Sequence, residues 1–172
     1  MKYTRLLPVS ALLAAIVIAP GWAQAPATPP TAAVLAVQGD IPSPLSLTAG
    51  DLARMHRQTV STPAPDGTKI VYEGVTLLEV LQKAGAPSGK QLRGKALASY
   101  VLAKAHDGYQ VTFTLGELDP QFGGESILVA DKRDGKPLPD KQGPFRLVCP
   151  NDKEGARSVR MLETLEVVRL AK

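Results

Sequence analysis

Glycine and proline interrupt this sequence so often that long regular elements cannot form. The 172 residues include 15 Gly and 15 Pro, and both residue types break helices and central strands. The apolar segments between them are short, which favours a loop-rich α+β or mostly-β fold over a helical bundle. The composition, 44% apolar and 21% charged, excludes disordered, collagen-like and disulfide-stapled classes. The length predicts one domain.

The first residues have the pattern of an export signal. Lys2 and Arg5 form a positive beginning, residues 12–18 form a short apolar segment, and Ala-Gln-Ala at 23–25 matches a cleavage site. The apolar segment falls short of the roughly 20 residues that a spanning helix needs. We therefore predict a cleaved signal peptide over residues 1–25 and a periplasmic mature chain that does not span the membrane. An uncleaved membrane anchor is the less favoured alternative.

The remaining chain divides into a short leader and one domain. Residues 26–33 are Pro, Ala and Thr only, which predicts a flexible leader before a domain over residues 34–172. Cleavage removes Lys2 and Arg5, so the formal charge of +4 falls by two. This small charge, together with the lack of a basic run, excludes a nucleic-acid partner of the electrostatic type.

Local patterns predict short helices between short strands. Two helices are expected after the N-cap residues Thr48 and Thr76, each followed by an acidic residue three positions later. They cover residues 49–55 and 77–84, with a further helical turn at 115–118. Strands are predicted at residues 34–37, 59–61, 69–72, 97–103, 109–114, 127–130, 145–149 and 165–170. Asp134-Gly135 is a hairpin signal within a long turn-rich segment.

Cys149 is the only cysteine, so no internal disulfide can form. Its apolar, strand-like surroundings favour a buried, inert thiol over a reactive or metal-ligating one. With two His and one Cys in the chain, a protein zinc site is not expected. Glycine-rich phosphate loops, nucleophile elbows and zinc-protease motifs do not occur in the sequence.

Two polar clusters are candidate sites. The first, at residues 106–109, contains Asp107 and Tyr109, and it suits a tight turn and a binding role equally well. The second is the loop at 150–160, in which Arg157 and Arg160 are three residues apart. Two guanidinium groups would suit an anion, a pterin ring or a carboxylate. From the residues alone, a solvated loop is the favoured interpretation of this second cluster.

A series of stretches, in this order along the chain, resembles the sulfite-oxidase-type molybdopterin-binding domain. The stretch Tyr-Glu-Gly-Val-Thr-Leu-Leu-Glu-Val-Leu is at 72–81, and Gly-Pro-Phe-Arg-Leu-Val-Cys-Pro is at 143–150. The resemblance covers nearly all of the chain from Val34 onward. It is carried by residues 45–47, 51–52, 72–81, 107–109, 128–130, 134–138, 143–150 and 156–160.

The resemblance implies a single mixed-sheet α+β domain with a cofactor crevice. In the family, a cysteine thiolate that precedes the aromatic-x-Gly-x-x-Leu stretch ligates molybdenum, but residues 55–72 contain no cysteine. A soft metal such as molybdenum prefers a thiolate ligand in such a site. Because this segment has no cysteine, we expect no molybdenum here. The family's Gly-x-Pro-x-Arg strand and the basic loop after it line the cofactor pocket, and Arg157 and Arg160 occupy the loop positions.

The expected function is therefore non-catalytic binding of a pterin or molybdopterin-like ligand. Short exported members without the cysteine resemble periplasmic pterin-binding proteins, which pass a signal to a membrane sensor. Arg157 and Arg160 would supply guanidinium contacts, Asp107 an acceptor and Tyr109 a stacking face. The predicted ligand-binding residues are Arg157, Arg160, Asp107, Tyr109, His56 and Ser158; we predict no catalytic or metal-ligating residues. The alternatives are a molybdenum-cofactor oxidoreductase, or a subunit of one, and an interaction domain that has lost the pocket.

Overall fold

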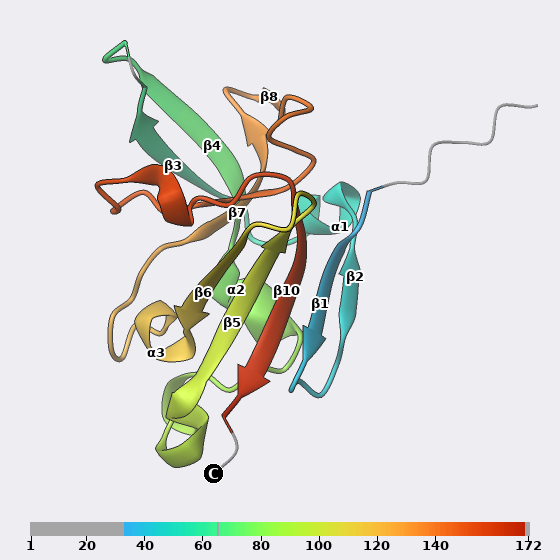
Figure 1. Ribbon diagram of the computed structural model, residues 1–172, viewed down its shortest axis with the longest axis vertical. Coiled ribbons are helices and arrows are strands. Elements are labelled where there is room, and N and C mark those ends of the chain that lie inside the picture. Colours follow the sequence, from blue (N-terminus) through green and yellow to red (C-terminus); the bar gives the residue numbers. More distant parts are fainter. Residues whose placement is uncertain (1–32, 65, 171–172) are drawn as a thin grey trace, which may run out of the picture. The chain divides into compact units, whose positions relative to one another are not determined.

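The computed structural model describes residues 33–64 and 66–170. The predicted signal peptide, and the leader up to residue 32, lie outside the described residues. Within the described residues, ten strands form two sheets, and Figure 1 shows β3 beside β4 in one of them and β5, β6 and β10 side by side in the other. The predicted α+β fold with mixed sheets is confirmed.

The first sheet has the strand order β2-β1-β10-β5-β6. Its strands are β1 (Leu35–Gly39), β2 (Leu45–Leu47), β5 (Ser99–Ala105), β6 (Gln110–Thr114) and β10 (Leu162–Arg169). β1 runs parallel to β10, and the other neighbours are antiparallel. Buried and less buried residues alternate along β5, as expected for a strand with one face in the core.

The second sheet is antiparallel and follows the order β3-β4-β7-β8, with β9 paired to β7. Its strands are β3 (Gln58–Pro63), β4 (Lys69–Thr76), β7 (Leu128–Arg133), β8 (Lys136–Pro137) and β9 (Arg146–Val148). The first four residues of β7 are all buried, so this strand is covered on both faces. The two sheets share one core, in which Leu165 and Val101 belong to the same buried cluster as Val75 and Val129.

The helices are short and begin where the sequence predicts. They are α1 (Ala49–Ala53), α2 (Leu77–Lys83), α3 (Leu115–Leu118) and three 3₁₀ turns, η1 (Gly89–Gln91), η2 (Gly94–Ala98) and η3 (Gly155–Arg157). Thr48 and Asp51 form the predicted reciprocal cap of α1, and Thr76 Oγ1 accepts the Glu79 amide at the start of α2. Within the part of the chain described, no helix has the length and apolarity required to cross a membrane.

Several predicted boundaries need correction: α1 ends at Ala53 and not at residue 55, β4 continues to Thr76, and β10 begins at Leu162 and not at residue 165. The strand predicted over 97–103 begins at Ser99 and ends at Ala105, because Leu97 belongs to the 3₁₀ turn η2 and remains exposed. The segment around Asp134-Gly135 forms a tight β7–β8 hairpin instead of a long loop. Both turn residues have positive φ angles, 51° and 75°, which match the two central positions of a type I′ turn.

Candidate functional site

A cavity with a volume of about 620 Å³ lies beside the second sheet. One wall belongs to the β3–β4 hairpin and is made by Thr62, Pro63, Ala64, Asp66, Thr68, Ile70 and Tyr72. The opposite wall follows β7, β9 and the loop after β9, and is made by Arg133, Gln142, Arg146, Val148, Cys149, Pro150, Asp152, Lys153, Gly155, Ser158 and Arg160. The hairpin wall lies within the segment in which the family resemblance places its metal-ligating cysteine.

Arg146 is the buried cation of this cavity. It lies on β9, only 8% exposed, and its Nη1 donates to Tyr72 Oη at 3.0 Å and to Gln142 Oε1 at 2.7 Å. The guanidinium carbon lies 4.8 Å from the centre of the Tyr72 ring. The Nε–H of Arg146 is buried and has no partner among the described residues. A buried, unpartnered donor on a charged group is costly, and an acceptor that reached this group would remove that cost.

The electrostatic field around Arg146 is also positive. Burial lowers the pKa of its guanidinium, and the charges of Arg160 and Arg133 lower it further, against an opposing effect of Tyr72. The cavity's two acids are already engaged, since Asp66 accepts from Thr68 and Asp152 binds Arg157. The cavity therefore favours an anionic group next to Arg146.

A second cavity of about 230 Å³ adjoins the first and shares Gly155, Ser158 and Arg160 with it. It also contains Asp107 and Tyr109 from the turn between β5 and β6. Four of the six predicted ligand-binding residues thus line one cavity, although they come from segments about fifty residues apart in the sequence.

Local hydrogen bonds fix three of these four side chains. Tyr109, 48% exposed, donates its hydroxyl to the Ala156 carbonyl at 2.8 Å, while Asp107 Oδ1 accepts the Tyr109 amide at 3.0 Å. Asp107 therefore forms the predicted tight turn through Oδ1, and its other carboxylate oxygen, Oδ2, does not take part in this hydrogen bond. Ser158 Oγ accepts the Cys149 amide at 3.0 Å. Contact of these residues with a ligand stays a prediction.

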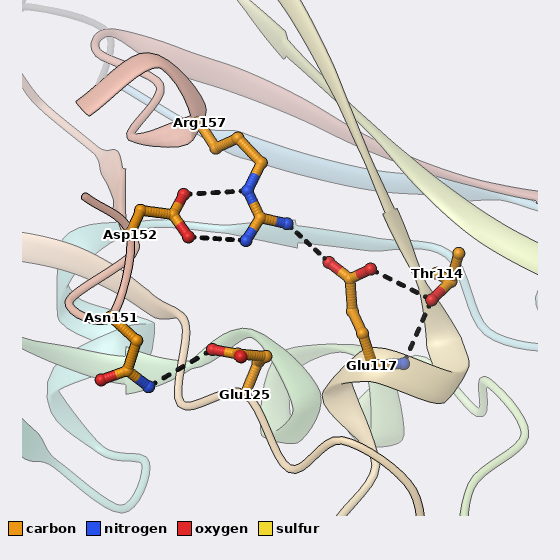
Figure 2. A network of polar contacts seen from close by, with 6 residues as sticks. All are labelled: Thr114, Glu117, Glu125, Asn151, Asp152 and Arg157. Atoms are coloured by element: carbon orange, nitrogen blue, oxygen red, sulfur yellow. Dashed lines mark hydrogen bonds and ion pairs between the residues drawn. The ribbon is translucent and has the colours of Figure 1, made fainter. Parts of the chain in front are cut away.

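Arg157 does not line either cavity. Its Nε and Nη2 donate to the two carboxylate oxygens of Asp152 at 2.8 and 2.7 Å, and Nη1 donates to Glu117 Oε1 at 2.9 Å (Figure 2). The hydrogen bonds that Arg157 donates to Asp152 raise the pKa of Arg157, and the same bonds lower the pKa of Asp152. All three guanidinium nitrogens thus have a partner within the protein.

His56 lies apart from the other predicted residues. Its side chain is 74% exposed and is absent from the lining of both cavities. Its backbone amide donates to Glu79 Oε1 at 3.1 Å, which connects the end of α1 to α2. A ligand contact of His56 stays a prediction without support from this geometry.

Cys149 is buried, as predicted, in the wall of the first cavity. Burial raises the pKa of its thiol to about 11, and the negative charge of Asp152 acts in the same direction. The thiol is therefore protonated at neutral pH. Within the described residues, no group of three or more His, Cys, Asp or Glu side chains is placed to hold a metal ion.

Our sequence analysis did not name Arg146 among the binding residues, although the family resemblance placed its strand in the cofactor pocket. A signal for it exists: an arginine stands inside the apolar run Phe-Arg-Leu-Val-Cys at 145–149. A charged residue at the centre of a buried strand needs a partner or a function. Arg133 and Lys153, which also line the cavity, lie in polar segments and give no comparable signal.

A comparison of the sequence with models of known families identifies the family of this domain. A model described as the oxidoreductase molybdopterin binding domain matches residues 66–171, more than half of the chain. The chain belongs to this family. The predicted resemblance is thereby confirmed, and the cavity beside Arg146 is part of a molybdopterin-binding, oxidoreductase-type domain. A search of curated proteins found no match.

A solved structure supports the fold of this molybdopterin-binding domain. The sulfane dehydrogenase SoxCD from Paracoccus pantotrophus superposes with a TM-score of 0.61 at 21% sequence identity. The alignment covers 78% of this chain but 38% of the SoxCD chain, so this chain spans well under half the length of that protein. At this identity the likeness establishes the fold alone.

The cavity fits the phosphate of a molybdopterin-type cofactor better than its metal. The unpartnered Nε–H of Arg146, with Arg133 and Arg160 nearby, suits an anionic group such as the phosphate of the pterin. A protein thiolate for the metal is not provided by residues 55–72, and the Cys149 thiol is held in its protonated form. When such a cofactor is bound, its pterin and metal supply the redox chemistry.

Proposed function

We propose that this domain binds a phosphorylated pterin of the molybdopterin type as a non-catalytic binding protein. The observation that carries the proposal is the buried Arg146, which lines a 620 Å³ cavity and whose Nε–H lacks a partner among the described residues. This volume lies within the usual range of small-molecule sites, about 300–1,000 Å³. Arg133, Lys153 and Arg160 add positive charge around the same cavity.

The proposal also accounts for the second cavity. A pterin offers a flat ring with hydrogen-bonding groups at its edge. Tyr109, which is exposed, and Asp107 line the smaller cavity, which adjoins the first and shares Ser158 and Arg160 with it. We place the anionic end of the ligand beside Arg146 and its ring toward Tyr109. A periplasmic location and signalling to a membrane sensor remain part of this proposal.

A molybdenum-dependent oxidoreductase, or a subunit of one, is the second candidate. Membership of an oxidoreductase family favours it, and so does the position of Cys149 in the wall of the same cavity. Metal analysis of the natively purified protein separates the two candidates. We expect bound pterin without stoichiometric molybdenum; about one molybdenum per chain, lost in Cys149→Ser, would establish the second candidate instead.

Titration with two matched probes tests the binding site. We expect 6-hydroxymethylpterin monophosphate to bind more tightly than 6-hydroxymethylpterin, and Arg146→Met to abolish that preference. Loss of a charge-assisted contact typically costs about 2–3 kcal/mol, or roughly 30- to 150-fold in affinity. Arg146→Lys keeps the charge and should retain part of the preference. As a control, Arg54→Ala breaks an exposed ion pair on α1 and should leave both affinities unchanged. Equal binding of the two probes by the wild-type protein would contradict an anion site at Arg146.

A further inference from the structure

The loop between β9 and β10 is a wall shared by both cavities. It places Ser158, Arg160 and Gly155 in both linings, and Lys153 in the larger one. The rest of the larger cavity belongs to the second sheet and its β3–β4 hairpin. The position of this loop relative to that sheet therefore determines the shape of the cavity.

Arg157 connects this loop to α3. Its guanidinium bridges Asp152, five residues earlier in the same loop, and Glu117, forty residues away on α3 (Figure 2). Glu117 is itself fixed, because its amide donates to Thr114 Oγ1 and the Thr114 hydroxyl donates to Glu117 Oε2, both at 3.1 Å. The Arg157 guanidinium also lies over the Phe113 ring, 5.3 Å from its centre.

Two further contacts hold the loop from the same side. Asn151 Nδ2 donates to Glu125 Oε2 at 3.3 Å, and Tyr109 Oη donates to the Ala156 carbonyl at 2.8 Å. All of these partners outside the loop lie between β5 and β7 in the chain. The loop is therefore held from the β6–α3 side at Asn151, Ala156 and Arg157, in addition to its bonds with β9 and the residue after it, in which Val159 O accepts the Leu147 amide and Ser158 Oγ accepts the Cys149 amide.

We propose that Arg157 is a positioning residue: it fixes the β9–β10 loop against Glu117 and thereby sets Ser158 and Arg160 at the border of the ligand cavity, without touching the ligand. A planar guanidinium can bind one carboxylate with two nitrogens and a second carboxylate with the third. A lysine ammonium does not reproduce that geometry, so the arrangement is specific to arginine. The link to ligand binding rests on the proposed function; the effect on the loop does not.

Hydrogen–deuterium exchange on the ligand-free protein tests the effect on the loop. In Arg157→Ala, we expect amides of residues 149–160 to exchange at least about tenfold faster, with β5 and β10 unchanged. Glu117→Gln should give a smaller change in the same peptide, and Arg54→Ala, which breaks another Arg–Asp pair, should give none. If Arg157→Ala fails to fold, Arg157→Lys provides the same test. Unchanged exchange in residues 149–160 would overturn the proposal.

A comparison of backgrounds tests how Arg157 acts on the ligand. With 6-hydroxymethylpterin monophosphate, Arg157→Ala should weaken binding about tenfold in the wild-type background. In a protein that already carries Ser158→Ala and Arg160→Ala, the same substitution should weaken binding by less than about threefold. The effects of substitutions at coupled residues on the binding free energy are not additive. An equal loss in both backgrounds would show direct ligand contact and overturn the positioning role. If wild-type protein does not bind the probe, the proposed function fails, and the exchange result still decides whether Arg157 positions the loop.

Discussion

Arg146 and Arg157 carry the same guanidinium group into two different electrostatic surroundings. Arg157 is held by the carboxylates of Asp152 and Glu117, which raise its pKa. Arg146 is buried beside Tyr72 without a carboxylate partner, and burial lowers its pKa. A guanidinium whose charge is already compensated has little to offer a ligand, whereas an uncompensated one gains from an incoming anion. The surroundings, rather than the residue type, therefore decide which of the two arginines has an uncompensated charge to offer an anion.

Cys149 gives a prediction at the same scale. Its pKa is raised from 9.0 to about 11 by burial, so its thiolate fraction at pH 8 should be about a hundredfold below that of the unfolded chain. Alkylation of the folded protein by iodoacetamide should be slower by at least that factor than alkylation in denaturant. Equal rates in the two states would show that the thiol is neither buried nor protonated.

The same shift predicts how stability depends on pH. Because the folded protein binds the thiol proton more tightly than the unfolded chain, the free energy of unfolding should fall as pH rises from about 9 to about 11. Cys149→Ala should remove this part of the pH dependence. Urea titrations of both proteins across that range provide the measurement, and parallel curves would contradict the assignment.

At the scale of elements, the contact between β4 and β7 depends on a glycine. Gly74 lies opposite Ala130 at a register shift of this strand pair. A Cβ at Gly74 would overlap the Val129 carbonyl oxygen and approach the Ala130 Cα to 2.7 Å. β4, which carries Tyr72, can therefore pair closely with β7 only because this position has no side chain.

Gly74→Ala should consequently destabilise the protein by about 3 kcal/mol, since the clash is with backbone that cannot move away. A matched control exists in α1, where a Cβ at Gly50 would meet only Thr48 Oγ1 at 3.6 Å. Gly50→Ala should therefore stabilise the protein by about 0.5–1 kcal/mol. Urea denaturation midpoints of the two variants should move in opposite directions; a neutral Gly74→Ala would show that the strands separate at little cost.

At the scale of the whole molecule, two sheets share one core, and the candidate cavity lies between the second sheet and the β9–β10 loop. Buried residues of both sheets form one cluster, while Tyr72, Leu128, Ala130, Leu138 and Val148 form a smaller second cluster. Tyr72 and Val148 of this smaller cluster also line the cavity. The floor of the cavity is thus continuous with a packed apolar cluster, which favours a preformed site over one assembled on binding.

Export is a prediction for the chain as a whole. The positive beginning, apolar segment and Ala-Gln-Ala sequence at 23–25 predict that the exported protein begins at Pro26. Mass spectrometry of the N-terminal peptide of protein purified from the periplasm provides the measurement. A peptide that begins at Met1 would contradict cleavage and favour the alternative of an uncleaved anchor.

Local patterns in the sequence determined the elements. The threonine caps at Thr48 and Thr76 start α1 and α2 because each cap is made within a few residues of sequence. Alternation of apolar residues identified β6 and β10 for the same reason. The order of motifs along the chain was sufficient to predict the family and its mixed-sheet fold, which the family match confirms.

The tertiary structure decided which side chains meet and what each can do. It brought Asp107 and Tyr109 to Ser158 and Arg160, kept His56 away from both cavities, and gave Arg157 two carboxylate partners. It also placed Arg146 in a buried, uncompensated position that sequence spacing does not reveal. Partners and desolvation depend on contacts between residues far apart in the chain, and these are fixed only when the sheets pack together.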